Sequence, residues 1–290
     1  MRPPTRFGLI LATLFGLVFA AASVLALIQI PSDVHVGKWS DALFKAVFVV
    51  VLGCFGFPIL ITVFFKWKVA VQAARSRAKY PDQPWLWRAD WAAGRIPDSS
   101  ISNMIGWWLI AVCYNAFSLP LLLLLFHEVF IKGNYRALLR LVFPGIGFVL
   151  LAIAITTSRR WRRFGKSVLV MPNGPGKIGG TLAGSIEVQK SFATTEMEFN
   201  LHLTCVQRKW SGSGNQRSMK ESKLWRAENK VRLDASGKIP VAFSVPANVR
   251  EANLQNGGNQ IIWRLEADMD PSSNGPDYSA TFDVPVFKIN

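Results

Sequence analysis

Four apolar stretches, each long enough to cross a lipid bilayer, constrain the fold of this chain more than any other feature. They cover residues 7–30, 43–65, 105–126 and 137–157. A helix needs roughly 20 apolar residues to cross the hydrocarbon core of a bilayer. A soluble protein would need four core helices that are apolar on all sides, so the sequence predicts a membrane protein with four transmembrane helices.

The first stretch is predicted to be an uncleaved anchor and not a secretory signal. It follows a basic start, Arg2 and Arg6, and the small residues at 20–22 could pass for a cleavage site. However, the apolar character continues through Ile30, beyond the roughly 7 to 15 apolar residues typical of a signal peptide.

The loop at 66–104, between the second and third stretches, predicts the orientation of the chain. It carries seven Lys/Arg and four Trp, and five more basic residues follow the fourth stretch. The two opposite connections, 31–42 and 127–136, carry three Lys/Arg between them. Lys and Arg near membrane helices stay on the cytoplasmic side, and Trp settles at the water–lipid boundary. We therefore expect both termini of this multi-pass protein to lie in the cytoplasm.

The net charge of +15 has its source beside the predicted membrane. Residues 1–166 carry 19 Lys/Arg and 6 Asp/Glu, whereas residues 167–290 carry 14 and 12. A basic chain can indicate nucleic-acid binding, but anionic inner-leaflet lipid is the nearer partner, at about 1 kcal/mol per basic residue. We predict no nucleic-acid partner. We expect lipid headgroups to contact the arginines after the fourth stretch, which are Arg159, Arg160, Arg162 and Arg163.

Beyond residue 166 the long apolar stretches give way to an alternation with a period of two. Apolar and polar residues alternate over 199–205, 241–245, 261–267 and 278–286, and turn-forming residues separate these segments. Such alternation predicts strands with one buried face, and short turns between them favour an antiparallel sandwich. The sequence thus predicts a transmembrane helical domain over 1–166, which includes the loop, and a cytoplasmic all-β sandwich over 167–290.

No catalytic, cofactor-binding or metal-ligating constellation is predicted, and we expect the protein not to be an enzyme. The cysteines Cys54, Cys113 and Cys205 lack metal-ligand or CxxC spacing, so each is expected to be a small buried hydrophobic residue. The histidines are scattered along the chain. A pair from the outer connections, His35 and His127, would leave a metal ion without a third ligand.

Three polar residues, Tyr114, Asn115 and Ser118, lie in the middle of the third stretch. An Asn in the bilayer needs hydrogen-bond partners, so it marks either a contact between helices or a permeation path. A transporter would usually carry ionisable residues there, and this favours the helix contact. Small residues, which let helices approach closely, recur in the first stretch at Ala12, Gly16 and Ala20 and in the second at Gly53 and Gly56.

The loop itself supports two hypotheses. The second helix is predicted to continue to about Ala78, because Pro81 and Pro84 follow it. Residues 87 and 91 are then predicted to share one face of a short helix that Gly94 closes. One hypothesis is an interfacial helix that seats the bundle in the membrane. The other is a docking surface for the sandwich or a partner, made of Trp85, Trp87, Arg88, Asp90 and Trp91.

Two parts of the sequence resemble known families. The motif at 80–92, Tyr-Pro-x-x-Pro-Trp-x-Trp-Arg-x-Asp-Trp-Ala, is similar to that of uncharacterised bacterial four-span membrane proteins, a domain family of unknown function. The segments 238–246, 262–265 and 277–287 resemble the closing strands of arrestin-like sandwiches, which are adaptors. These resemblances imply a bacterial inner-membrane protein with an arrestin-like or immunoglobulin-like sandwich that binds proteins or membranes.

The leading functional hypothesis is a membrane-anchored interaction or scaffold protein, whose sandwich recruits a protein partner at the cytoplasmic face. The alternative is a small transport or channel-accessory protein with a polar path near Asn115. Neither hypothesis requires a cofactor, and either is compatible with a homo-oligomer.

Overall fold

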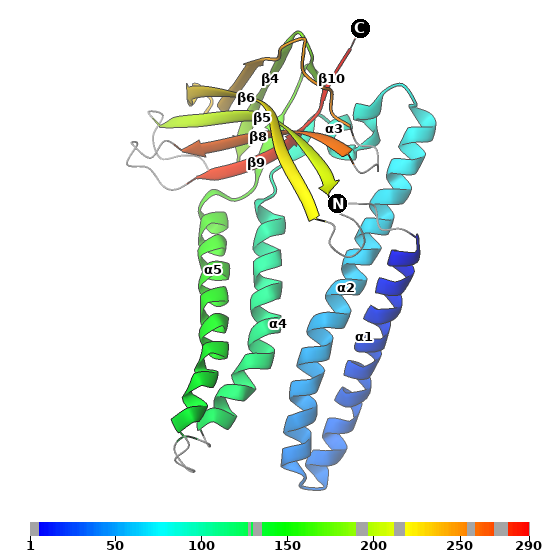
Figure 1. Ribbon diagram of the computed structural model, residues 1–290, viewed down its shortest axis with the longest axis vertical. Coiled ribbons are helices and arrows are strands. Elements are labelled where there is room, and N and C mark those ends of the chain that lie inside the picture. The colour runs from blue at the N-terminus through cyan, green and yellow to red at the C-terminus, as the bar shows by residue number, and fades with distance from the viewer. Residues whose placement is uncertain are drawn as a thin grey trace. The chain divides into compact units, whose positions relative to one another are not determined.

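The computed structural model describes residues 6–126, 129, 135–189, 197–211, 218–253, 259–269 and 278–289. For some helix and strand residues within these ranges it describes the backbone but not the side chain. The chain forms two compact units (Figure 1). The helical unit comprises the described residues of Pro4–Val69 and Asn103–Ser158. The sandwich unit comprises Ala70–Ser102 and the described residues of Arg159–Asn290. Most of the loop at 66–104 therefore belongs with the strands, and not with the helices to which the sequence assigned it.

Four long helices carry the apolar stretches, and their bounds are α1 (Arg6–His35), α2 (Trp39–Lys79), α4 (Ser100–Phe126) and α5 (Val142–Phe164). A 3-10 helix, η3 (Tyr135–Leu141), precedes α5, so the fourth predicted stretch becomes α-helical only at Val142. The helix α2 ends at Lys79, which confirms the predicted stop before Pro81.

Three helices are long and apolar enough to cross a membrane, which makes this chain a membrane protein by helix length and composition. The segments are Ile10–His35 in α1, Lys45–Lys79 in α2 and Val142–Phe164 in α5. The prediction of four spans is wrong for the described residues. The helix α4 covers the third predicted stretch but is not one of these three segments.

Small residues bring α1 and α2 into backbone contact. A Cβ atom added at Gly56 would lie 2.5 Å from the backbone nitrogen of Ala20, and one added at Gly16 would lie 3.0 Å from the side chain of Leu60. This confirms that Gly16 and Ala20 lie on a face of α1 that packs closely against α2.

The turn between α1 and α2 explains a charge inside the second predicted stretch. The ammonium nitrogen of Lys45 lies 2.6 Å from a carboxylate oxygen of Asp33 on the preceding helix. The connection itself is short, and Gly37 adopts a φ of +75°, a conformation that suits glycine because it has no Cβ atom.

The sandwich unit contains two four-stranded sheets, and all their strand pairs are antiparallel. The first sheet has the order β1-β2-β4-β7, with β1 (Arg95–Pro97), β2 (Ser167–Val170), β4 (Thr181–Val188) and β7 (Ile239–Ser244). The second has the order β6-β5-β8-β9, with β6 (Ser218–Arg232), β5 (Glu198–Ser211), β8 (Asn259–Met269) and β9 (Ser279–Val284). The short strands β3 (Gly176–Lys177) and β10 (Val286–Phe287) form a parallel pair.

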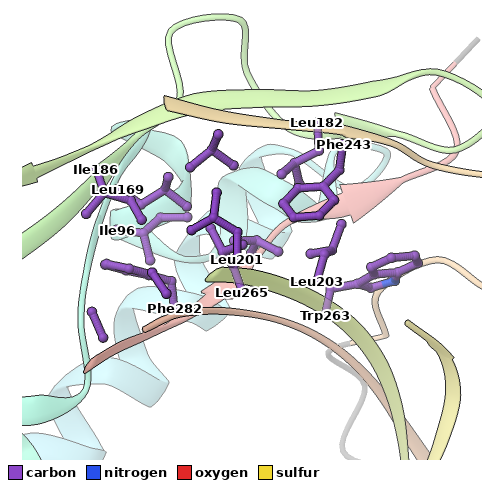
Figure 2. Close-up of a cluster of buried hydrophobic side chains, with 14 of the residues drawn as sticks. Ile96, Leu169, Leu182, Ile186, Leu201, Leu203, Phe243, Trp263, Leu265 and Phe282 are labelled. Carbon is purple, nitrogen blue, oxygen red and sulfur yellow. The ribbon is translucent and has the colours of Figure 1, made fainter. Parts of the chain in front are cut away.

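Both sheets contribute to one hydrophobic core (Figure 2). The first sheet supplies Ile96, Leu169, Leu182, Ile186 and Phe243, and the second supplies Leu201, Leu203, Trp263, Leu265 and Phe282. Burial of such side chains is the main stabilising contribution to a fold of this kind. The predicted antiparallel sandwich is therefore confirmed at the level of its two sheets and shared core.

The predicted alternation is confirmed in β5, β7, β8 and β9. The inward residues of β5, for example, are Phe199, Leu201, Leu203 and Cys205, and all four are fully buried. Three predicted turns, at 211–215, 256–258 and 272–276, lie wholly or almost wholly outside the described residues. Most of the connection at 127–136, including His127, also lies outside the described residues.

Candidate functional site

The loop between α2 and α4 contributes a strand to the sandwich. Its residues Arg95, Ile96 and Pro97 form β1, which pairs with Val170, Leu169 and Val168 of β2. The backbone N–H of Met171 also donates to the carbonyl of Gly94 at 2.8 Å. Ile96 is only 1% exposed and belongs to the core. The loop is thus an edge of the first sheet.

Trp91 anchors the loop to the opposite sheet. Its indole N–H donates to the carbonyl of Asp283 on β9 at 2.8 Å, and its ring lies edge-on to Phe287 with centroids 5.9 Å apart. Trp85 also contacts Phe287, at 5.8 Å between centroids. Trp91 is only 7% exposed, so its side chain does not lie at a membrane–water interface. These contacts favour the docking hypothesis for the loop over the interfacial helix.

The same loop covers the free edge of β9. The backbone N–H of Ser99 donates to the carbonyl of Thr281 at 3.2 Å, two residues from the Asp283 carbonyl that receives the Trp91 indole. Alternate carbonyls on an edge strand point away from the sheet and invite pairing with another chain. Here the loop satisfies two of them.

Arg88 joins the two short helices of the loop. It lies between η1 (Pro84–Trp87) and α3 (Ala89–Ala92) with an extended backbone, φ −105° and ψ 132°. The expected single helix with residues 87 and 91 on one face is therefore wrong. The guanidinium makes two hydrogen bonds to Asp90, lies 4.4 Å from the centre of the Trp91 ring, and is 3.9 Å from a carboxylate oxygen of Asp283.

Gly94 ends α3 as predicted. Its φ of +61° is a left-handed conformation that suits glycine, and a Cβ atom there would lie 2.9 Å from the carbonyl oxygen of Met171.

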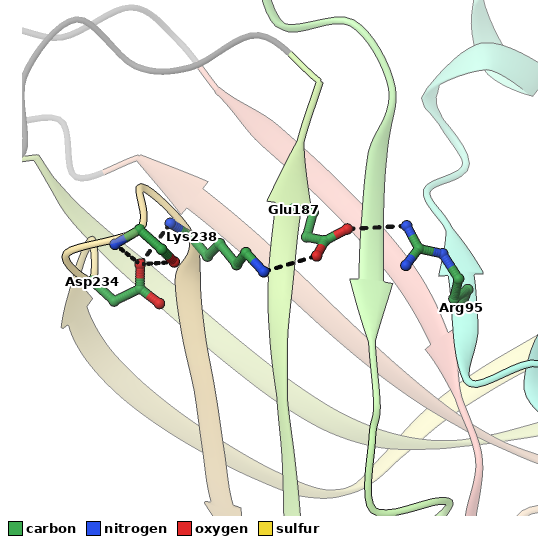
Figure 3. Close-up of polar contacts among 5 residues, drawn as sticks. Arg95, Glu187, Asp234 and Lys238 are labelled. Atoms are coloured by element: carbon green, nitrogen blue, oxygen red, sulfur yellow. Dashed lines mark hydrogen bonds and ion pairs between the residues drawn. The ribbon is translucent and has the colours of Figure 1, made fainter.

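An ion-pair network crosses the outer surface of the first sheet and holds β1 (Figure 3). The carboxylate of Glu187 on β4 accepts from Arg95 of the loop and from Lys238, each at 3.0 Å. These hydrogen bonds, that of Lys238 above all, hold the pKa of Glu187 below its usual value. The loop that precedes β7 is closed by Asp234, which accepts from the backbone N–H of Lys238 at 2.9 Å.

Trp87 lines a groove that no sequence pattern predicted. Its indole N–H donates to the carbonyl of Tyr80 at 2.8 Å, and the guanidinium of Arg77 lies 4.9 Å from the centre of its ring. Together with Pro84 it faces the segment 247–253, the start of β8 and the residues around Phe287. The groove has a volume of about 610 Å³, which is in the size range of ligand sites.

A buried carboxyl group lies where the loop meets α4. Asp98 is 8% exposed, and its Oδ1 atom has no hydrogen-bond partner among the described residues. Burial raises the pKa of Asp98 to about 6, although hydrogen bonds from the backbone of Ser100 and Ser167 oppose this. Ser167 also accepts a hydrogen bond from the hydroxyl of Tyr278 at 3.1 Å. No sequence pattern singles out this group, because one Asp before a helix looks like an ordinary cap.

We expect Asp98→Asn to change how stability depends on pH. Folded Asp98 binds its proton more tightly than the unfolded chain does, so lowering the pH from about 7 to 4 favours the folded wild type. The variant lacks this gain, so wild type should gain stability relative to Asp98→Asn over that range. Denaturant unfolding of both proteins at several pH values measures the difference.

Asp234→Asn is the matched control. Hydrogen bonds lower the pKa of Asp234, and the bond from the Ser236 hydroxyl contributes most. The contribution of Asp234 to stability is present above a pH of about 4 and is lost at lower pH. Its dependence on pH therefore has the opposite sign to that of Asp98. A parallel pH response of Asp98→Asn and wild type would contradict the prediction.

In the helical unit, Asn115 connects α4 to α5. Its amide N–H2 donates to the carbonyl of Ala111 at 2.8 Å and to that of Gly147 on α5 at 3.0 Å. Asn115 is 6% exposed and Ser118 is fully buried, while Tyr114 lines a separate apolar groove between α2 and α4. A Cβ atom at Gly147 would lie 2.4 Å from the amide oxygen of Asn115. Of the three predicted intramembrane residues, Asn115 and Ser118 are buried, whereas Tyr114 lies apart from them in the other groove.

Asn115→Leu is expected to weaken the contact between α4 and α5, because it removes a hydrogen bond between helices and enlarges a side chain against Gly147. The cost should be about 1–2 kcal/mol. Unfolding of the purified protein by SDS in mixed micelles measures it, with Val112→Leu, at an exposed position of α4, as control. Equal midpoints for the two variants would contradict the assignment.

The predicted lipid-contacting arginines occupy the end of α5. Arg159, Arg160, Arg162 and Arg163 are all exposed, and α5 ends one residue later at Phe164, which is buried against Tyr278 with centroids 5.1 Å apart. Basic residues in a last helical turn also complement the helix dipole. Contact of these side chains with lipid stays a prediction.

Within the described residues, no group of three or more His, Cys, Asp and Glu side chains could hold a metal ion. Cys205 is buried on β5, and burial raises the pKa of its thiol to about 11. A thiol of this kind is poorly reactive.

Comparison with known proteins adds little to this picture. No family model matches the chain, and no curated protein matches it. Among solved structures, the crystal structure of Spo0M, a sporulation control protein from Bacillus subtilis, matches 43% of this chain at 12% sequence identity with a TM-score of 0.28. The match spans about half of that chain, 49%. A likeness this weak carries no argument, so the sandwich assignment depends on the strands and core described above.

Proposed function

We propose that the protein is a membrane-anchored adaptor whose β-sandwich presents a protein-binding surface at the cytoplasmic face. The main support is that the loop between α2 and α4 completes the sandwich with β1 and the buried Trp91. The chain therefore passes between the helical and sandwich units three times. A domain with several covalent connections to its anchor has less freedom to lose on binding than one on a single linker.

The proposed orientation follows from the basic residues of the loop and of the end of α5. A reporter fused after Asn290 in the full-length protein is expected to report a cytoplasmic location. A periplasmic signal would contradict the orientation. The finer likeness of the sandwich to arrestin-like adaptors, and a bacterial inner-membrane location, belong to the same proposal.

Photocrosslinking in intact cells tests the adaptor function. A benzophenone amino acid is placed singly at exposed sandwich positions such as Lys223 and Ala247, and at Ile61, an exposed apolar position of α2, as control. We expect the sandwich positions, but not Ile61, to give protein adducts whose identity by mass spectrometry is reproducible. Only lipid adducts, or the same adducts as Ile61, would contradict an adaptor.

The transport alternative has less support, because the amide N–H2 of Asn115 is engaged by the carbonyls of two helices. It stays a prediction. Flux in liposomes that Asn115→Leu abolishes would favour it.

A further inference from the structure

We propose that the groove beside Trp87 binds an extended segment of a partner protein in which apolar residues flank one acidic residue. This inference rests on the proposed adaptor function, and it names the surface that would serve it and the chemistry of the partner. The groove lies wholly within the sandwich unit, between loop residues 84–87 and the strands.

The walls of the groove offer apolar contacts at several points. Pro84 and Trp87 line it from the loop, and Ile178, Val249 and Phe287 line it from the sandwich. Trp87 is held by its hydrogen bond to Tyr80 and by the stacked Arg77, so its ring is already in place. A fixed aromatic ring loses little entropy on binding, which is why such rings anchor protein partners.

The charged side chains of the groove are mostly basic. Arg250 and Lys288 are both exposed and line the groove, and neither side chain has an acidic partner among the described residues. The carboxylate of Glu251 also lines it and accepts the backbone N–H of Lys288 at 3.4 Å. Two basic groups without an acidic partner favour one acidic residue in the bound segment.

A peptide fits these walls better than a lipid headgroup does. Glu251 would repel a ligand that is only anionic, but it can accept a backbone N–H from a peptide. Asn253 and Asn259 also line the groove, and the Asn259 amide oxygen accepts from Gln207 at 2.8 Å. Because the amide oxygen of Asn259 is the acceptor in this contact, its N–H2 group can donate a hydrogen bond to a peptide carbonyl.

The test selects random phage-displayed peptides against the full-length protein in phosphatidylcholine nanodiscs. Selected peptides are then measured against the variant Arg250→Glu and the control Lys223→Glu, which reverses a charge in the same way at an exposed position on β6. We expect the peptides to share an acidic residue between apolar residues. Arg250→Glu should weaken binding about tenfold, because it turns an attraction into a repulsion, while Lys223→Glu should change it less than about twofold.

A charge exchange makes the test specific. Replacing the acidic residue of a selected peptide by Lys should restore part of its affinity for Arg250→Glu and lower its affinity for wild type. Trp87→Phe, which keeps an aromatic ring, should weaken binding less than Trp87→Ala.

The proposal is overturned if no peptide is enriched, if Arg250→Glu and Lys223→Glu behave alike, or if soluble glycerol phosphate displaces the peptides and marks a headgroup site. None of these results decides the adaptor function, which is judged by crosslinking in cells. Partner adducts at Lys223 but not at Ala247, which lines the groove, would keep the adaptor and reject the groove.

Discussion

Replacing Trp91 by alanine is expected to lower the free energy of unfolding of the sandwich unit by about 3–5 kcal/mol. The side chain is 7% exposed, contacts Phe287, and donates its indole N–H to Asp283. Its removal leaves a cavity between the loop and β9 and an unsatisfied carbonyl on the edge of that strand. It also removes the aromatic ring against which the Arg88 guanidinium lies. Three losses at one position make this the largest single effect we expect in the sandwich.

Hydrogen exchange and denaturant unfolding of the detergent-solubilised protein measure this effect. The amides of β1 and β9 should exchange faster in Trp91→Ala, because the loop no longer covers the strand edge. Trp91→Phe keeps most of the apolar surface and should cost less, with about 1 kcal/mol for the lost hydrogen bond. Trp67→Ala, at a side chain that is 55% exposed, is the matched control. Unchanged exchange in β9 would show that the loop is not part of the sandwich.

Replacing Gly56 by leucine is expected to separate α1 from α2. A Cβ atom there would lie 2.5 Å from the backbone nitrogen of Ala20 and 3.0 Å from its Cα atom. Both are backbone atoms, so no rotamer change can make room and the helices must move apart. Overpacking of this kind costs about 1–3 kcal/mol, and here the close approach of the two backbones is lost as well.

Distances between spin labels on α1 and α2 measure the separation, and SDS unfolding in mixed micelles measures the cost. Gly56→Ala should have the same effect to a smaller degree. Gly106→Ala and Gly106→Leu are the controls, because nothing lies within 4 Å of a Cβ atom at Gly106 on α4. If Gly56→Leu left the label distances unchanged, the close contact between α1 and α2 would be wrong.

Regular periodicity is what made much of the fold predictable. The apolar stretches became helices because a backbone in lipid must satisfy its own hydrogen bonds. The buried residues alternate strictly along β8 and along 199–203 of β5, and each strand was predicted from this pattern. In contrast, β6 has only a few half-buried apolar residues, such as Trp225 and Val231, so its alternation was too weak to recognise.

The strand β1 could not be predicted from its own sequence. It has three residues, Arg95, Ile96 and Pro97, which are too few to show a period, and its partner β2 lies about 70 residues further along the chain. Asp98 was missed for a similar reason. Its backbone N–H donates to the carbonyl of Ser167, which comes from a distant segment.

The sequence alone determined the class of this protein, the end of α2, and the antiparallel character of the C-terminal half, because each depends on local composition and periodicity. The role of the Trp-rich loop was decided only by the tertiary structure. A Trp beside a membrane helix satisfies its indole N–H equally well at a lipid interface or inside a protein. The choice for Trp91 depends on the carbonyl of Asp283, 192 residues away, and no local pattern records that contact.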